Sequence, residues 1–263
     1  MIKNIVITGS TRGIGYEMAL KFLEADCNVT LSGRKEEMPE DKSDKLAKFE
    51  DKLIYIKCNV QDLDDLQNLW DRSVEKWGCV DVWINNAGRN SPDSYIWETD
   101  EKSTADIIRT NITGMILGSQ VAAKNMLARD TGFIYSMEGL GSNNMIQEKT
   151  VLYGTTKCAL TYFMKGLAKE LEKSGVKAGR LSPGMMLTDF ITKTPEGEPS
   201  EVVTNEKFKK VFNILADRPE TVAAYLVPKI LSNNKNNAHI MWLTNRKAAF
   251  RFMTAPFRKR KLI

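Results

Sequence analysis

The sequence predicts an α/β fold in which a single doubly wound, seven-stranded parallel sheet is flanked by helices on both faces. Seven short apolar runs rich in β-branched residues alternate with segments whose apolar residues recur at helical spacing. Runs such as Ile5-Val6-Ile7 and Val82-Trp83-Ile84 are apolar at consecutive positions, as expected of strands buried on both faces. Because no Pro-rich or Gly/Ser-rich linker and no internal repeat divides the chain, we expect one domain.

Each predicted element follows from its local pattern. The seven strands are Ile2–Thr8, Asn28–Ser32, Leu53–Lys57, Val80–Asn85, Gly132–Ser136, Val176–Leu181 and Ala238–Leu243. After the third strand, a helical stripe consists of Leu63, Leu66, Leu69, Trp70, Ser73, Val74 and Trp77. Strands separated by helices pair in parallel, because the crossover returns the chain to the same edge. The segment Thr192–Asn205 carries two prolines and a glycine, and therefore predicts a mobile loop where substrate would enter.

Composition narrows the possible chemistry. The chain has 263 residues, a formal net charge of +5 and a single histidine, His239. With one histidine, a His-rich metal site is excluded and only His239 could serve a Ser-His-Asp triad; we expect no metal and a structural role for His239. The four cysteines, Cys27, Cys58, Cys79 and Cys158, lie far apart, as is typical of reduced thiols. No apolar stretch approaches the roughly 18 to 20 residues of a spanning helix. We therefore expect a cytoplasmic protein with no spanning segment.

The last residues differ from the rest in charge. Residues 246–263 hold seven Lys or Arg, no acid, and the aromatic residues Phe250, Phe252 and Phe257, whereas residues 1–245 carry a formal charge of −2. We expect a catalytic domain over 1–245 and a basic tail over 246–263. We expect this tail to pack across a subunit interface or over the substrate cleft. Peripheral membrane contact is the alternative. Specific nucleic-acid binding is not expected, since the remainder offers no extended basic track.

A glycine-rich turn ends the first strand, with the sequence Thr8-Gly9-Ser10-Thr11-Arg12-Gly13-Ile14-Gly15. Glycines after a buried strand let the backbone turn sharply and approach a phosphate, whose charge the N-terminal N–H groups of the following helix stabilise. This context, at the start of a β-α unit, predicts a dinucleotide-binding site.

The spacing of those glycines and four later motifs resemble the short-chain dehydrogenase/reductase family. The motifs are Asn85-Asn86-Ala87-Gly88, Asn111, Tyr153-Gly154-Thr155-Thr156-Lys157 and Pro183-Gly184-Met185-Met186-Leu187-Thr188. The resemblance spans about residues 1–245 and implies a Rossmann-type domain that binds a nicotinamide dinucleotide. The cofactor-binding residues it implies are Gly9, Ser10, Thr11, Arg12, Gly13, Ile14, Gly15, Arg34, Asn59, Val60, Asn86, Ala87, Gly88, Tyr153, Lys157, Pro183, Gly184, Met186 and Thr188.

Arg34 at the end of the second strand selects among nicotinamide cofactors. A carboxylate there would accept from the ribose of NAD, whereas Arg34 offers a planar fork that suits a 2′-phosphate. The family often places a second basic contact where Arg12 lies. We therefore expect NADP(H). Asn59-Val60 stands where similar enzymes carry Asp-Val beside the adenine, a change of small expected consequence.

Tyr153 and Lys157 are the expected catalytic pair. Four residues apart on one helix, they share a face, so the ammonium can lower the pKa of the phenol and hold the nicotinamide ribose. By resemblance, Asn111 supports a proton relay through water to Lys157.

The family's catalytic serine is missing after the fifth strand, where Glu138-Gly139 replaces the usual Ser-Ser. Three alternatives remain: Ser142 supplies the hydroxyl, Glu138 acts as a protonated acid, or the orienting group is absent. The segment Met137–Ser142 also resembles plant chlorophyll b reductases, a branch of the family that reduces a ring formyl group.

The sequence therefore predicts an NADP(H)-dependent oxidoreductase that interconverts a small-molecule carbonyl and an alcohol. A nucleotide-sensing regulator with little catalysis is the alternative that the missing serine suggests. Family members commonly form homo-dimers or homo-tetramers through the helices that carry Asn111 and Tyr153.

Overall fold

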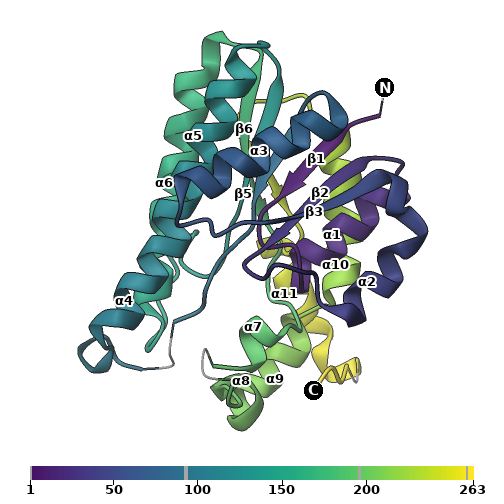
Figure 1. Ribbon diagram of the computed structural model, residues 1–263. Helices are drawn as coiled ribbons and strands as arrows, with labels where there is room; N and C mark the ends of the chain where they lie inside the picture. Colours follow the sequence, from purple (N-terminus) through teal and green to yellow (C-terminus); the bar gives the residue numbers. More distant parts are fainter. Residues whose placement is uncertain (1, 92–93, 195–196, 259) are drawn as a thin grey trace.

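The computed structural model describes residues 2–91, 94–194, 197–258 and 260–263, and it contains one sheet of seven parallel strands flanked by helices (Figure 1). The strands are β1 (Asn4–Ile7), β2 (Asn28–Gly33), β3 (Leu53–Lys57), β4 (Val82–Asn85), β5 (Gly132–Met137), β6 (Val176–Ser182) and β7 (Ala238–Met241). Their order across the sheet is β3-β2-β1-β4-β5-β6-β7. The predicted doubly wound α/β fold is confirmed.

The helices connect these strands in the expected alternation. They are α1 (Gly13–Glu24), α2 (Glu40–Leu46), α3 (Leu63–Trp77), α4 (Glu101–Ile108), α5 (Gly114–Leu127), α6 (Val151–Glu170), α7 (Asp189–Thr192), α8 (Glu201–Thr204), α9 (Glu206–Leu215), α10 (Pro219–Ser232) and α11 (Asn245–Thr254). Short 3₁₀ turns span Ala47–Lys52, Ile96–Glu98, Leu171–Lys173 and Ala255–Phe257.

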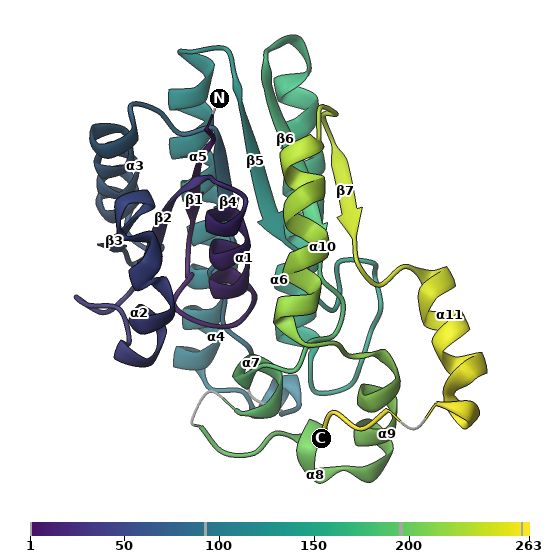
Figure 2. The ribbon, with the colours of Figure 1, turned by 90° about the vertical axis from the view of Figure 1, so that its right-hand side faces the viewer.

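Helices cover both faces of the sheet, because successive strand residues point to opposite sides. Ile5 and Ile7 of β1 pack into one apolar cluster with α1 and α10, whereas Val6 between them packs into the other with α3, α5 and α6. Figure 2 shows α1 and α10 in front of the sheet and α5 and α6 behind it. Burial on both faces explains why these strands are apolar at consecutive positions.

The strand order reverses between β1 and β4. The chain builds β1, β2 and β3 outward in one direction and then crosses to β4 on the other side of β1. Connections that leave the carboxyl ends of β1 and β4 therefore diverge, and ligands of doubly wound folds bind in the crevice formed there. The glycine turn and the segment after Asn85 lie at this point.

The segment predicted as a mobile loop, Thr192–Asn205, contains more regular secondary structure than expected. It contains α8, and Lys193 forms an antiparallel bridge with Pro199. Backbone hydrogen bonds from Thr194 to Glu198 (2.8 Å) and from Ser200 to Thr192 (3.0 Å) close the turn locally. Pro195 and Glu196 lie outside the described residues. Together α7, α8 and α9 extend below the carboxyl edge of the sheet (Figure 1).

The basic tail is fastened to the body of the protein rather than projecting from it. Arg251 and Arg260 both pair with the buried carboxylate of Asp217, which precedes α10. Leu262 and Ile263 pack beside Phe212 of α9. Within the described residues, no helix is long and apolar enough to cross a membrane.

Candidate active site

The glycine turn adopts backbone conformations that require glycine. Gly9 and Gly13 have φ values of +62° and +58°, in the left-handed region. A Cβ at Gly9 would lie 2.8 Å from the Cα of Ala87, so the turn packs directly against the segment after β4. Near Gly13, by contrast, the closest heavy atom to such a Cβ is the methyl of Thr188, at 3.8 Å. The turn is therefore tightly supported from behind and open in front.

Asn86 supports the glycine turn through its side-chain amide. Its Nδ2 donates to the carbonyl oxygens of Thr8 (3.0 Å) and Gly9 (2.9 Å). The hydroxyl of Thr8 in turn accepts from the backbone N–H groups of Asn86 and Ala87. Among the predicted cofactor residues, Asn86 thus shapes the turn, and Thr8 is a supporting residue that sequence reasoning missed.

The space in front of the turn fits a phosphate-bearing dinucleotide. Arg12 is the N-cap residue of α1, but its side chain makes no capping hydrogen bond. The first backbone N–H groups of that helix therefore have no acceptor from the N-cap side chain. These donors, and the positive end of the helix dipole, face the open side near Gly13. Thr188, the N-cap residue of α7, lies on the far side of this space, and it belongs to the Pro183–Thr188 segment of the sequence prediction.

The end of β2 presents a cation next to the turn. Arg34 is exposed, and no hydrogen bond or ion pair with another described residue engages its guanidinium or that of Arg12. A Cβ at Gly33 would lie 2.6 Å from the methyl of Thr11, which places the two predicted segments in contact. The geometry suits the expected binding of a 2′-phosphate by Arg34 and Arg12.

Asn59 and Val60 occupy the predicted position after β3, but Asn59 is partly used by its own turn. Its Oδ1 accepts from the backbone of Gln61 (3.3 Å), and its backbone N–H donates to Asp65 (2.8 Å). Val60 is buried against Gly114, where a Cβ would lie 2.8 Å from the Val60 side chain. Both residues are therefore held by local contacts with their own turn and with the start of α5.

Asn111 lies in a π-helical stretch, Arg109–Thr113, between α4 and α5. Its amide oxygen accepts from the backbone N–H of Arg89 (2.8 Å), while its amide nitrogen donates to the Arg89 carbonyl (2.9 Å) and to the Thr156 hydroxyl (3.1 Å). Such bulges often occur at functional sites. Asn111 thereby joins the segment after β4 to α6, one residue before Lys157.

Tyr153 and Lys157 are both buried on α6. The Lys157 ammonium donates to the carbonyl oxygen of Met137 (2.8 Å) and lies 5.7 Å from the centre of the Tyr153 ring. Burial lowers the pKa of Lys157 to about 8, although Glu138 raises it. Burial also raises the pKa of Tyr153, opposite to the direction expected from the sequence. The cause is desolvation of the phenolate, so the Tyr153 phenol is neutral at ordinary pH.

The geometry of the loop after β5 bears on the three alternatives for the missing serine. The Ser142 hydroxyl accepts from the backbone N–H of Gly139 (3.2 Å) and donates to the carbonyl of Lys157 (3.3 Å), so the loop backbone already uses its proton. Burial would raise the pKa of Glu138, but hydrogen bonds from His239 and Ser182 lower it to about 2. Glu138 is therefore ionised at neutral pH and is no protonated acid. The geometry favours the third alternative, in which this loop supplies no orienting hydroxyl.

Comparison with known proteins identifies the family to which this chain belongs. Residues 3–199 match the family model described as short chain dehydrogenase. The chain belongs to this family. A chlorophyll(ide) b reductase NOL of Arabidopsis thaliana, described as chloroplastic, is 33% identical to this short-chain dehydrogenase over 255 residues, covering 93% of this chain and 71% of the relative. A solved structure, ElxO with NADP bound, superposes with a TM-score of 0.80 at 25% identity, covering 95% of this chain and all of that one.

A third relative is longer than this short-chain dehydrogenase. The probable chlorophyll(ide) b reductase NYC1 of Arabidopsis thaliana, also chloroplastic, is 31% identical over 275 residues, which covers 98% of this chain. The chain spans about half of that relative, 54% of its length. The expectation of a cytoplasmic setting is wrong, because both relatives are chloroplastic. Cysteine spacing reports a reducing environment, which does not distinguish one compartment from another.

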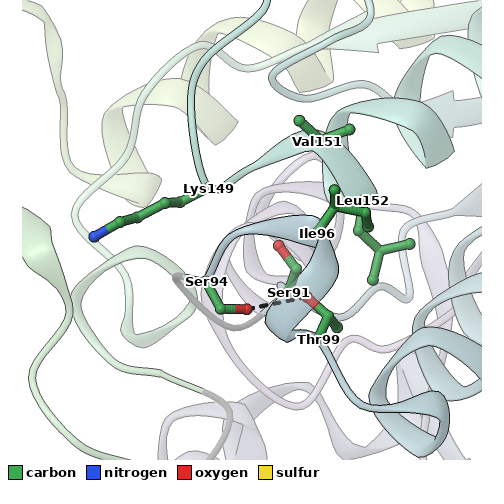
Figure 3. A pocket seen from close by; sticks show the side chains of 7 residues that line it. All are labelled: Ser91, Ser94, Ile96, Thr99, Lys149, Val151 and Leu152. Carbon is green, nitrogen blue, oxygen red and sulfur yellow. Dashed lines mark hydrogen bonds between the residues drawn. The ribbon is translucent and has the colours of Figure 1, made fainter.

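A small cleft lies where α6 begins, directly before the tyrosine of this short-chain dehydrogenase. Its lining residues are Ser91, Ser94, Ile96, Thr99, Lys149, Val151 and Leu152 (Figure 3). The hydroxyls of Ser94 and Thr99, which both line it, are 3.0 Å apart. Leu152 and Tyr153 share an apolar cluster with Phe190 of α7, so the cleft and the tyrosine belong to one region.

Sequence reasoning missed the cluster around Glu138. The carboxylate binds Arg180, Ser182 and His239, which lie 42 to 101 residues further along the chain. No local pattern links positions so far apart. The one available signal was a carboxylate at the end of a buried strand, where it must be paired.

Proposed function

We propose that this short-chain dehydrogenase is an NADP(H)-dependent carbonyl reductase that converts an aldehyde or ketone to an alcohol, or catalyses the reverse. One observation carries the proposal: the neutral, buried phenol of Tyr153 lies next to the Lys157 ammonium, beside the end of β5 at the carboxyl edge of the sheet. The NADP-bound neighbour supports the cofactor.

Each residue then has a defined task. NADP(H) supplies or accepts the hydride. Tyr153 donates a proton to the substrate oxygen as negative charge develops on it, and its raised pKa keeps that proton in place until then. Lys157, held by Met137, contributes positive charge beside the phenol and stabilises the phenolate that follows. Asn111 fixes α6 to the segment after β4 and so maintains the distance between the two halves of the site.

The proposed substrate carries its carbonyl on a bulky, largely apolar body, and a formyl group on a ring is the form suggested by the chlorophyll(ide) b reductases. Exposed apolar side chains support this size and polarity: Ile96 and Val151 line the cleft, and Trp97, Met145 and Ile146, in the segments that contribute to it, are exposed as well. Gly139 adds no side chain beside the Tyr153 hydroxyl. A formyl group projecting from a large ring can therefore approach the phenol without displacing a serine.

We also propose a homo-oligomer assembled through α4, α5 and α6. Large side chains on these helices are exposed, namely Ile108, Leu127 and Tyr162, and Tyr162 is 83% accessible. Apolar residues of this size are often covered in the assembled state.

The test is turnover of an aldehyde and ketone panel, including a formyl-bearing tetrapyrrole, followed by loss of NADPH absorbance. We expect Tyr153→Phe to abolish turnover while calorimetry shows nearly unchanged NADPH affinity, since the hydroxyl acts on the substrate oxygen. Lys157→Ala is expected to weaken both. If the Phe variant turns over like the wild type, another residue supplies the proton. If the wild type binds NADPH but reduces nothing in the panel, the regulator alternative gains support.

A further inference from the structure

The residue that replaces the serine, Glu138, is the centre of a buried polar cluster. Its Oε1 accepts from the Thr161 hydroxyl (3.1 Å) and from Arg180 (3.2 Å). Its Oε2 accepts from the Ser182 hydroxyl and lies 2.7 Å from His239 Nε2. The carboxylate is 4% accessible. It thus connects the end of β5 with α6, β6 and β7.

The two neighbours of Glu138 along the chain contact the reacting pair. Met137, directly before it, accepts the hydrogen bond from the Lys157 ammonium. Gly139, directly after it, lies so close to Tyr153 that an added Cβ would be 2.3 Å from the phenol oxygen. A shift of residues 137–139 would therefore move both the acceptor of Lys157 and the wall beside Tyr153.

We propose that Glu138 is a positioning residue that anchors this strand end and thereby places Lys157 and Tyr153 for proton transfer. The proposal rests on the function proposed above. Glu138 does not touch the substrate oxygen, so it does not do the work of the serine it replaces. Glu138 compensates for the missing serine by fixing the positions of Lys157 and Tyr153. A preorganised site requires its reacting groups to be held in place in this way.

In addition to its hydrogen bonds, the negative charge of Glu138 affects the protonation of Lys157, beside Tyr153. The charged or titratable groups near it are Arg180 on β6, His239 on β7, and Lys157 and Tyr153 on α6. The negative carboxylate favours the protonated form of Lys157, against the effect of burial. Removing the charge must therefore lower the pKa of Lys157, and a larger fraction of that ammonium will be deprotonated at neutral pH.

The test uses Glu138→Gln, which retains the shape and loses the charge. We expect kcat at neutral pH to fall at least about tenfold, while the NADPH Kd from calorimetry stays within about threefold. The alkaline limb of the pH profile is expected to move to lower pH, because it follows Lys157. NMR of lysine-labelled protein provides a readout without turnover, in which the Lys157 pKa falls in the variant.

Two further variants separate positioning from general loss of stability. Glu138→Gln leaves the buried Arg180 unpaired, so the double variant Glu138→Gln/Arg180→Met removes both charges and is expected to regain thermal stability but not kcat. Asp217→Asn breaks another buried ion-pair cluster, lowers Tm, and is not expected to move the alkaline limb. A folded Glu138→Gln with unchanged kcat, pH limb and Lys157 pKa would overturn the proposal. If the wild type lacks activity, the NMR titration still decides the role of Glu138, so the two failures are distinguishable.

Discussion

Arg34 illustrates how a single exposed residue can set cofactor choice. Its guanidinium has no partner among the described residues, and Gly33 before it leaves no room for a side chain that would contact the ribose. The cation is therefore available for a 2′-phosphate, whereas a carboxylate at this position would repel one. We therefore expect selectivity at this position to depend on charge rather than on packing.

We expect Arg34→Asp to reverse the preference of the protein from NADPH to NADH, measured as Kd by calorimetry. Lys35→Asp is the matched control, because it makes the same change of charge one residue further along the exposed segment and is expected to keep the preference for NADPH. Equal affinity of the wild type for both cofactors would contradict the assignment.

Ser142 lies in the loop where the family's catalytic serine is missing, but its side chain has a structural role. Its hydroxyl joins the backbone of Gly139 to that of Lys157, within the loop itself. We therefore expect Ser142→Ala to lower kcat by less than about tenfold, since one neutral hydrogen bond contributes roughly 0.5 to 1.5 kcal/mol. Steady-state kinetics beside Tyr153→Phe measure the difference. A loss as large as that of the Phe variant would return Ser142 to the catalytic role expected from the sequence.

At the scale of elements, the active site depends on close contacts between α6 and the end of β5. The helix carries Tyr153 and Lys157, and the strand end supplies the carbonyl of Met137 and the backbone of Gly139. The backbone and the phenol can approach this closely only because residue 139 has no side chain.

We expect Gly139→Ala to reduce kcat by more than about tenfold, because the new methyl would displace the Tyr153 hydroxyl and misplaced reacting groups are costly. Gly166→Ala is the matched control, because Gly166 lies on α6, the helix that carries Tyr153. Nothing lies within 4 Å of the position where its Cβ would be, and alanine favours helices over glycine, so activity is expected to persist and Tm to rise slightly. Wild-type kcat in the Gly139 variant would show that the phenol tolerates displacement.

At the scale of the whole molecule, the basic tail, which follows the edge strand β7, is bonded to the end of α9 and to Asp217. Arg260 donates to the carbonyls of Ile214 (3.0 Å) and Ala216 (2.8 Å), at the end of α9, and to Asp217 (2.8 Å). Asp217 exchanges backbone hydrogen bonds with Met185 and Leu187 of the predicted cofactor segment. Direct hydrogen bonds therefore join the tail, the end of α9 and that segment.

We expect Arg260→Met to lower Tm by several degrees and to raise substrate KM, since it removes three hydrogen bonds that hold α9. Arg246→Met is the matched control, because Arg246 is exposed on α11 and its side chain makes no hydrogen bond or ion pair with another described residue. Light scattering and sedimentation with anionic vesicles complete the comparison. Loss of vesicle binding in the Arg246 variant, with unchanged kinetics in the Arg260 variant, would assign the tail to a membrane surface instead.

The sequence by itself determined the strand order along the chain, the nucleotide turn and the Tyr153–Lys157 pair. These features depend on residues close in sequence, because helical and strand periodicity act over a few positions and four residues span about one helical turn. Only the tertiary structure decided the direction of the Tyr153 pKa, the engagement of Ser142 and the ionised state of Glu138. Each of these depends on burial and on partners brought together from distant strands, such as Arg180 and His239, and no local pattern encodes that proximity.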